Sequence, residues 1–117
     1  MKFSIEQDQI LEALQKVQSI VGQRTTLPIL SNVLLEADNE TLTLTTTDQE
    51  VSVRTTLEAD ISEPGATTLP ARRFFSICRE LPSHQVDITV TSNDVAEISS
   101  GAANFKLEGL SKDDFPP

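Results

Sequence analysis

The sequence predicts an α+β domain built from two β-α-β-β-β units, with both helices on one face of antiparallel sheets. Two observations lead to this fold class. A stretch of helical apolar spacing occurs twice, and each time one short β-rich run precedes it and three follow it. The same order returns after about 60 residues, and such self-similarity indicates a repeated structural unit. The 117 residues suit one domain with a single core.

The first unit is expected at about residues 1–62, and it begins with a strand because Lys2 to Ile5 alternates between polar and apolar residues. One apolar stripe then predicts a helix, and it comprises Ile10, Leu11, Leu14, Val17, Ile20 and Val21. Gly22 is a natural end for this helix, and Ser4 and Gln7 have the spacing of a capping box at its start. Three further strands are predicted at Leu30–Glu36, Thr41–Thr46 and Val51–Glu58.

The second unit is expected at about residues 63–112 and repeats this order, starting with a strand at Ala66–Leu69. Pro70 fits the first turn of a helix, where its missing N–H costs nothing, and Pro82 ends that helix. Its apolar stripe comprises Ala71, Phe74, Phe75, Cys78 and Leu81. Strands are predicted at Val86–Thr91, Val95–Ser99 and Asn104–Glu108. Residues 113–117 have the composition of a linker, and we expect them to lead to a second domain outside this sequence.

Charge is distributed unevenly along the chain. The total of 18 acidic against 9 basic residues gives a net charge of −9, which argues against a basic nucleic-acid binder. However, the stretch from Glu36 to Glu63 holds eight acids and only Arg54, whereas bases without acids collect before and after it. This segregation favours a protein that contacts a polyanion on one side and repels it elsewhere. Chance clustering in a soluble acidic domain is the alternative.

Several function classes are excluded or disfavoured by composition. Cys78 is the only cysteine, so no internal disulfide can form, and a single free thiol suits a reducing, cytoplasmic location. No apolar run approaches the roughly 20 residues that span a bilayer, so we expect no contact with a membrane.

Catalytic constellations are missing from the sequence. His84 is the only histidine, and Cys78 lies on an apolar stripe, so a Cys-His pair is not expected. Asp48 and Glu50 alternate as two acids on a solvated strand do, and no glycine-rich phosphate loop is present. We therefore expect no enzyme activity, no metal site and no cofactor.

Two stretches share Thr-Thr-Leu-Pro beside arginine, and they carry a family resemblance. Gly22–Asn32 resembles the loop after the first helix of the bacterial sliding clamp, the beta subunit of DNA polymerase III. Pro70–Pro82 is similar to the second helix of that family, Pro-Ala-Arg-(Arg/Lys)-Phe-Phe-x-Ile-Cys-Arg-x-Leu-Pro. The opening Met1-Lys2-Phe3 and the closing Asp114-Phe115-Pro116 also resemble it. The resemblance covers essentially the whole chain but only the first, N-terminal domain of the three in the family.

The resemblance implies a DNA-clamp fold and a function as a processivity factor. In the family a closed ring encircles double-stranded DNA, with helices lining the hole and sheets forming the rim. Arg24 and Arg72 match positions that touch the DNA backbone, and Arg79 and Lys16 are weaker candidates. Arginine suits phosphate through its planar donor fork, and such contacts carry no sequence information. The polar face of the first predicted helix is mildly acidic, which fits this role less well.

The last predicted strand concerns assembly. In the resembling family this edge pairs with a second subunit, head to tail, to form a homodimeric ring. The resemblance implies interface roles for Arg73, Asn104, Phe105, Lys106 and Leu107. Arginines that flank the matching phenylalanine in some clamps are Ala102 and Asn104 here, so the ionic contacts would fall to Arg73 and Lys106. DNA polymerase and the clamp loader would bind through the family's other domains.

Two other functions fit the composition. An acidic, β-rich module could recruit a protein partner through an edge strand, because Phe105 and Leu107 share one face of the last predicted strand. A small acidic hydrolase is the other alternative, and the missing catalytic constellation argues against it.

Overall fold

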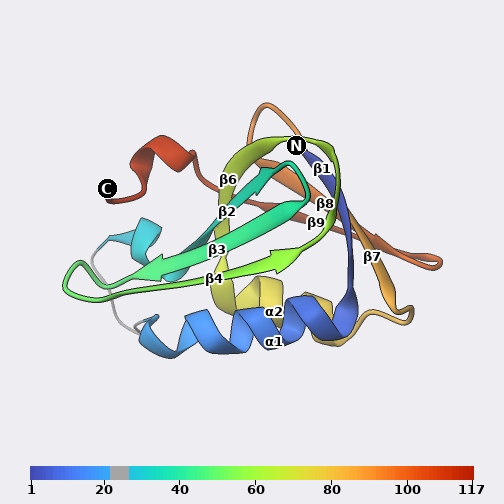
Figure 1. Ribbon diagram of the computed structural model, residues 1–117, viewed down its shortest axis with the longest axis horizontal. Helices are drawn as coiled ribbons and strands as arrows, with labels where there is room; N and C mark the ends of the chain where they lie inside the picture. The colour runs from blue at the N-terminus through green and yellow to red at the C-terminus, as the bar shows by residue number, and fades with distance from the viewer. Residues whose placement is uncertain (22–26) are drawn as a thin grey trace.

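The computed structural model describes residues 1–21 and 27–117. Two helices and nine strands are described within these ranges (Figure 1). The order is β1 (Lys2–Glu6), α1 (Gln7–Val17), β2 (Asn32–Asp38), β3 (Thr41–Thr47), β4 (Ser52–Glu58), β5 (Asp60–Glu63), β6 (Gly65–Pro70), α2 (Ala71–Arg79), β7 (Gln85–Val90), β8 (Val95–Ser100) and β9 (Ala103–Glu108). Short 3-10 helices occupy Gln18–Ile20, Pro28–Ser31 and Lys112–Asp114. The predicted order of strands and helices is therefore present, with β5 as an unpredicted addition.

The strands form two antiparallel sheets that exchange their first strands. One sheet has the order β4-β3-β2-β6 and the other β5-β1-β7-β8-β9. Strand β6 follows the first three-stranded run in the chain, yet it pairs with β2, and β1 pairs with β7. Each predicted unit thus contributes its first strand to the sheet of the other unit. This interlocking joins the two halves of the chain into one body.

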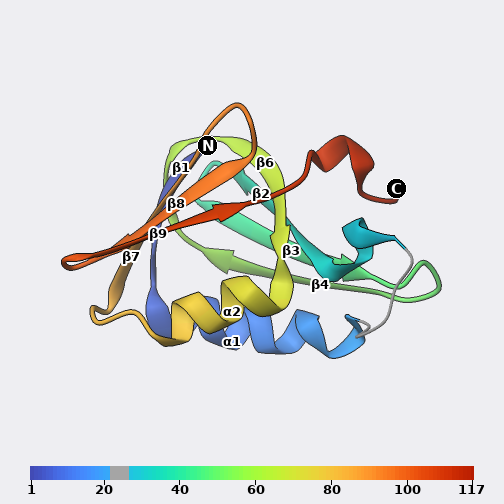
Figure 2. The same ribbon diagram turned by 180° about the vertical axis from the view of Figure 1, so that it is seen from behind.

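Both helices lie side by side on one side of the sheets, as predicted (Figures 1 and 2). The apolar stripe of each helix faces inward: Ile10, Leu14 and Val17 of α1 and Phe74 and Cys78 of α2 are fully buried. They pack with the inward residues of both sheets into one core. The opposite, polar faces of the helices are left to solvent, because a period of 3.6 residues separates the two kinds of side chain.

The start of α1 is held by the end of α2. The Gln7 side-chain amide donates hydrogen bonds to the Cys78 and Leu81 carbonyl oxygens, at 2.8 and 2.9 Å. Cys78 lies in the last turn of α2, where a helix lacks partners for its C=O groups, and Leu81 follows the C-cap Glu80. The capping box predicted from Ser4 and Gln7 is wrong, because the N-cap is Glu6 without a side-chain bond and the Ser4 hydroxyl donates to Asp87.

Several predicted boundaries shift in the structure. Helix α1 ends at Val17 and continues as a 3-10 turn to Ile20, while the predicted stop at Gly22 lies outside the described residues. The strand predicted from Leu30 begins two residues later, because Pro28–Ser31 is a 3-10 helix. Pro70 is the last residue of β6 and the N-cap of α2, one position before the first turn.

A second connection brings the two sheets together beyond β9. Leu110 forms an antiparallel bridge with Thr68 of β6. Gly109, which precedes Leu110, passes so close to the β6 backbone that a Cβ atom on it would lie 2.1 Å from the Thr68 carbonyl oxygen. Only glycine fits such an approach. The bridge fixes the far end of β9, and its stretch from Ala103 to Leu107 remains the outer edge of the five-stranded sheet.

Candidate nucleic-acid interface

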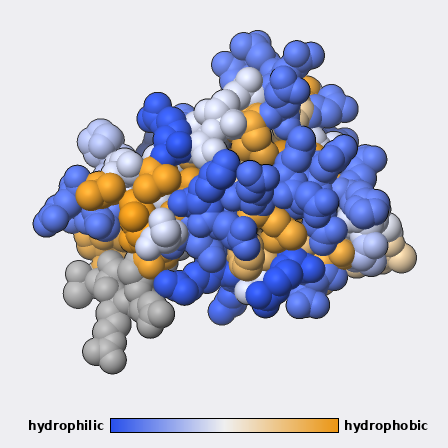
Figure 3. Space-filling view, turned by 60° about the horizontal axis from the view of Figure 1, so that its bottom comes forward, coloured by the Kyte–Doolittle hydropathy of each residue, from blue (hydrophilic) through white to orange (hydrophobic). Residues whose placement is uncertain are grey.

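The exposed faces of α1 and α2, together with Glu80 at the end of α2, form what we call the helix surface. Figure 3 shows this side of the molecule largely covered by hydrophilic side chains, with an apolar patch at its left end. The exposed charged residues of the helix surface are Asp8, Glu12, Lys16, Arg72, Arg73, Arg79 and Glu80. The helix surface therefore carries four bases and three acids, whereas the whole chain has twice as many acids as bases.

Arg72 is anchored at the start of α2. Its Nη2 donates a hydrogen bond of 3.1 Å to the Val21 carbonyl oxygen. Val21 is the last described residue before the segment that carries Arg24. Arg24 itself lies among residues 22–26, outside the described part, so its role stays a prediction. In the described chain Arg72 forms no ion pair, and a guanidinium has five N–H donors, so most of them remain available to an anion.

The two weaker candidates are both paired with a carboxylate. Lys16 Nζ lies 3.4 Å from Glu12 Oε1, one helical turn earlier, and both side chains are more than half exposed. Arg79 Nε lies 3.9 Å from Glu80 Oε1, and its guanidinium sits 5.6 Å from the centre of the Phe75 ring. The spacing of Glu12 and Lys16, four residues apart on a predicted helix, is the sequence signal for this pairing. No sequence pattern signals the pairing of Arg79 with its neighbour.

The arrangement of the helix surface suits phosphate contacts rather than base recognition or catalysis. Phe75, the aromatic residue closest to Arg79, is half-buried beneath the guanidinium. Cys78, on the inward face of α2, is fully buried as predicted, and burial raises the pKa of its thiol to about 12. A thiol in that environment is a poor nucleophile.

The edge strand β9 presents its two apolar residues differently. Phe105 stands opposite Ile98 and Leu107 opposite Ala96, so both lie on the inward face of the sheet. Leu107 is only 5% exposed and belongs to the core, whereas Phe105, nearer the turn between β8 and β9, is 37% exposed. Leu107 is therefore a core residue in this domain. Phe105 is the one that offers apolar surface to a partner.

The polar candidates for assembly are exposed. Asn104 and Lys106 lie on the outward face of β9, and the Asn104 side-chain oxygen accepts a hydrogen bond from the Ser99 hydroxyl. Arg73 is exposed on α2 and has no ion pair among the described residues. Their interface roles stay predictions.

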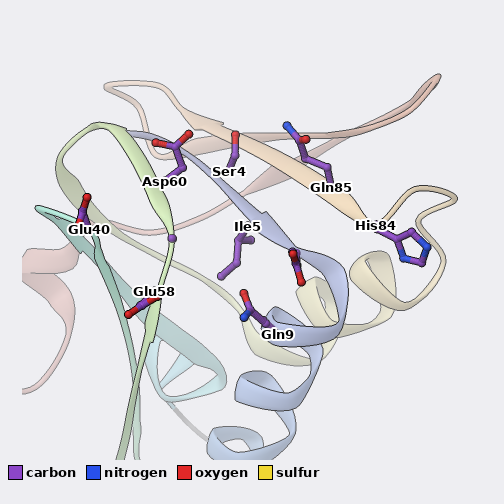
Figure 4. Close-up of a pocket in the computed structure, with 10 residues that line it drawn as sticks. Ser4, Ile5, Gln9, Glu40, Glu58, Asp60, His84 and Gln85 are labelled. Carbon is purple, nitrogen blue, oxygen red and sulfur yellow. The ribbon is translucent and has the colours of Figure 1, made fainter.

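An open groove of about 720 Å³ lies at the start of α1, and no sequence pattern predicts it. Figure 4 shows Glu40, Glu58 and Asp60 on its β4–β5 side and Gln85 and His84 on the opposite side. The carboxylates make this region unfavourable for a polyanion. Among the described residues, no three His, Cys, Asp or Glu side chains are grouped so that they could hold a metal ion.

Comparison with known proteins gives a consistent result. The family model described as "DNA polymerase III beta subunit, N-terminal domain" matches residues 1–117. The Beta sliding clamp of Vibrio harveyi is 42% identical over 118 residues, which cover 99% of this chain and 81% of that sequence. The Beta sliding clamp of Escherichia coli K12 is 43% identical over 117 residues, covering 99% of this chain and 32% of that protein.

Solved structures agree with the sequence relatives. The DNA polymerase sliding clamp of Bacillus subtilis superposes with a TM-score of 0.96 at 34% identity, over 100% of this chain and 33% of that one. The sliding clamp of Caulobacter crescentus gives 0.94 at 38% identity, over 100% and 32%. The chain thus spans about a third of the length of most of these relatives. Within its described ranges, no helix has the length and apolar character needed to cross a membrane.

Proposed function

Because this chain belongs to the family of N-terminal domains of the DNA polymerase III beta subunit, we propose that it is the first domain of a bacterial sliding clamp. The full-length protein would form a ring that encircles double-stranded DNA and keeps the polymerase attached, as a processivity factor in the cytoplasm. It would act as a tether without chemistry of its own. The buried, protonated Cys78 thiol supports a non-catalytic role.

The observation that carries this proposal is the helix surface. It joins two helices from different halves of the chain, and it holds four of the nine bases of an acidic protein. Arg72, which has no carboxylate partner among the described residues, donates a hydrogen bond to Val21, the residue that precedes the Arg24 segment. These two arginines would make the principal DNA contacts, and Lys16 and Arg79 would add weaker ones. All would be phosphate contacts, which hold DNA of any sequence.

The edge of β9 supports the assembly of the ring. A second clamp subunit would add a strand to this edge, head to tail, with Phe105 packed across the joint. Arg73, Asn104 and Lys106 would contribute polar contacts around it, and Leu107 would support Phe105 from the core. DNA polymerase and the clamp loader would bind through parts of the subunit outside this chain, to which residues 113–117 would lead.

Duplex binding at different salt concentrations tests the DNA contacts. If Arg24, Arg72 and one further base each neutralise a phosphate, the logarithm of the binding constant should fall with the logarithm of salt with a slope of about −2.7. Replacing Arg24 and Arg72 with alanine should flatten this slope by about 1.8, because each phosphate contact accounts for roughly 0.9. Fluorescence anisotropy with a labelled duplex of arbitrary sequence measures both values.

Arg54 provides the matched control for this experiment. It is exposed on β4, on the face of the four-stranded sheet that points away from the core, so Arg54→Ala removes one positive charge outside the helix surface and is compared with the single variant Arg72→Ala. The control should leave the slope unchanged. An unchanged slope in the Arg24/Arg72 variant would remove these residues from the site. Absence of any salt-dependent binding would instead favour the alternative of a protein-interaction module that uses the exposed edge at Phe105.

A further inference from the structure

We propose that Glu12 and Glu80 are built-in counter-charges that keep the affinity of the helix surface for duplex DNA low. This inference rests on the proposed function and deepens it. Of the four bases on the helix surface, Lys16 and Arg79 each have one of these carboxylates within 4 Å. Arg72 and Arg73 have no carboxylate at that distance among the described residues. The surface therefore contains two compensated and two uncompensated bases.

A paired base is a poor ligand for phosphate. To neutralise a phosphate, Lys16 must leave Glu12 or bring the phosphate close to a second negative charge. The ion pair is exposed and contributes little to stability, but the carboxylate remains within one helical turn wherever the lysine side chain moves. The same holds for Arg79, which is also held above the Phe75 ring. Each carboxylate thus reduces the number of counterions that are released when the surface binds DNA. That number sets the salt dependence of DNA binding.

The position of Glu80 is not explained by the stability of the helix. Glu80 is the C-cap of α2. The C-terminal end of a helix carries a partial negative charge, so an acid there is unfavourable. By contrast, Asp8 lies in the first turn of α1, where a negative charge is favourable. The charge of Glu80 is therefore unfavourable for the helix. Its position beside Arg79 on the helix surface is explained if its role is to compensate that base.

Weak contact is what a sliding tether requires. A ring keeps hold of DNA by enclosing it, so strong phosphate contacts add friction without improving retention. Compensation of two of the four bases leaves contacts that position the duplex and still release it. The acids on the helix surface would then determine affinity, and those on the sheets would only repel DNA from the outside.

The test compares Glu12→Gln/Glu80→Gln with a matched control in the complete 117-residue chain. Glutamine keeps the size and polarity of both side chains and removes their charge. Each freed base can neutralise one phosphate, so the salt slope should steepen by up to about 1.8, and affinity at low salt should rise by about tenfold or more. The control is Glu36→Gln, which removes one acidic charge from the outward face of the four-stranded sheet and is compared with each of the single variants Glu12→Gln and Glu80→Gln.

The outcomes separate this inference from the proposed function. Steeper, tighter binding by the Glu12/Glu80 variant alone supports the inference, and thermal melting should show the Glu80→Gln variant at least as stable as the parent. If the parent binds and Arg72→Ala weakens binding, but the Glu12/Glu80 and Glu36 variants behave alike, the inference is wrong and the proposed function stands. If neither the parent nor the Glu12/Glu80 variant binds duplex DNA at low salt, both are wrong.

Discussion

Cys78 lies where α2 meets the core, and none of its surface is exposed to solvent. Its place on an apolar stripe was predicted from spacing alone, because a helical period of 3.6 residues fixes which side chains share a face. Burial disfavours the thiolate, which raises the pKa of Cys78 from its ordinary value of 9.0 to about 12. The thiol is therefore neutral and protected in the folded protein at every physiological pH.

We expect Cys78 to react with iodoacetamide at pH 8 only when the protein unfolds. Because burial raises the pKa of Cys78 in the folded state, the neutral thiol favours folding fully below about pH 9. This contribution to the free energy of unfolding is lost as pH rises towards 12. Mass spectrometry after a timed exposure, with and without urea, measures the protection. Rapid labelling of the native protein, at the rate of the urea-unfolded chain, would show that α2 does not cover this residue.

The helices are amphipathic elements whose existence follows from local sequence, but their mutual orientation does not. Gln7 carries no obvious signal in the sequence other than a capping spacing that proved wrong. In the fold its side chain joins α1 to one carbonyl group in the last turn of α2 and one just after that helix, 71 and 74 residues away. This bond helps to fix the relative position of the two helices, and so the spacing of the bases on the helix surface.

We expect Gln7→Ala to lower the free energy of unfolding by about 1–3 kcal/mol, because both side-chain hydrogen bonds from Gln7 are lost. Urea denaturation followed by circular dichroism measures this change. Gln9→Ala is the matched control, since Gln9 is exposed on the same turn and its side chain forms no hydrogen bond among the described residues. Equal stability of the two variants would mean that the bridge between the helices contributes nothing.

The molecule as a whole is an interlocked pair of sheets with an exposed edge at β9. The exchange of β1 and β6 means that neither half can form its sheet without the other. The limits of the two repeat units, at about 62 and 63, therefore stay a proposal about sequence periodicity rather than about separable parts. On the edge strand β9, Leu107 packs into the core that both halves share, whereas Phe105 remains partly exposed.

We expect Phe105→Asp and Leu107→Asp to act at different levels. In the isolated chain Phe105→Asp should leave stability nearly unchanged, because this side chain is already 37% exposed. Leu107→Asp should unfold the domain or destabilise it by several kcal/mol, since it places an unpaired charge in the core. Urea denaturation of both variants measures this contrast, and equal stabilities would contradict the assignment of Leu107 to the core.

In the ring that we propose for the full-length subunit, Phe105→Asp would place a charge in the joint at β9, so we expect the protein to sediment as a monomer. The substitution should also abolish retention on circular DNA, which the parent ring should show and linear DNA should not. Sedimentation and a gel-filtration retention assay measure the two effects. An intact dimer of the Phe105→Asp protein would remove β9 from the ring interface.

Local sequence patterns predicted both helices, the face that each helix buries and every described strand except β5, because periods of 2 and 3.6 residues act over a few neighbouring positions. It also located the basic stretches, with Arg72 on the exposed face of α2. Strand pairing could not be predicted in the same way, because it joins residues that are far apart in the chain. For the same reason, only the fold could show that Leu107 is core and Phe105 is surface, that Arg72 bonds to Val21, and that Gln7 holds α2. These contacts depend on three-dimensional proximity, to which one-dimensional patterns are insensitive.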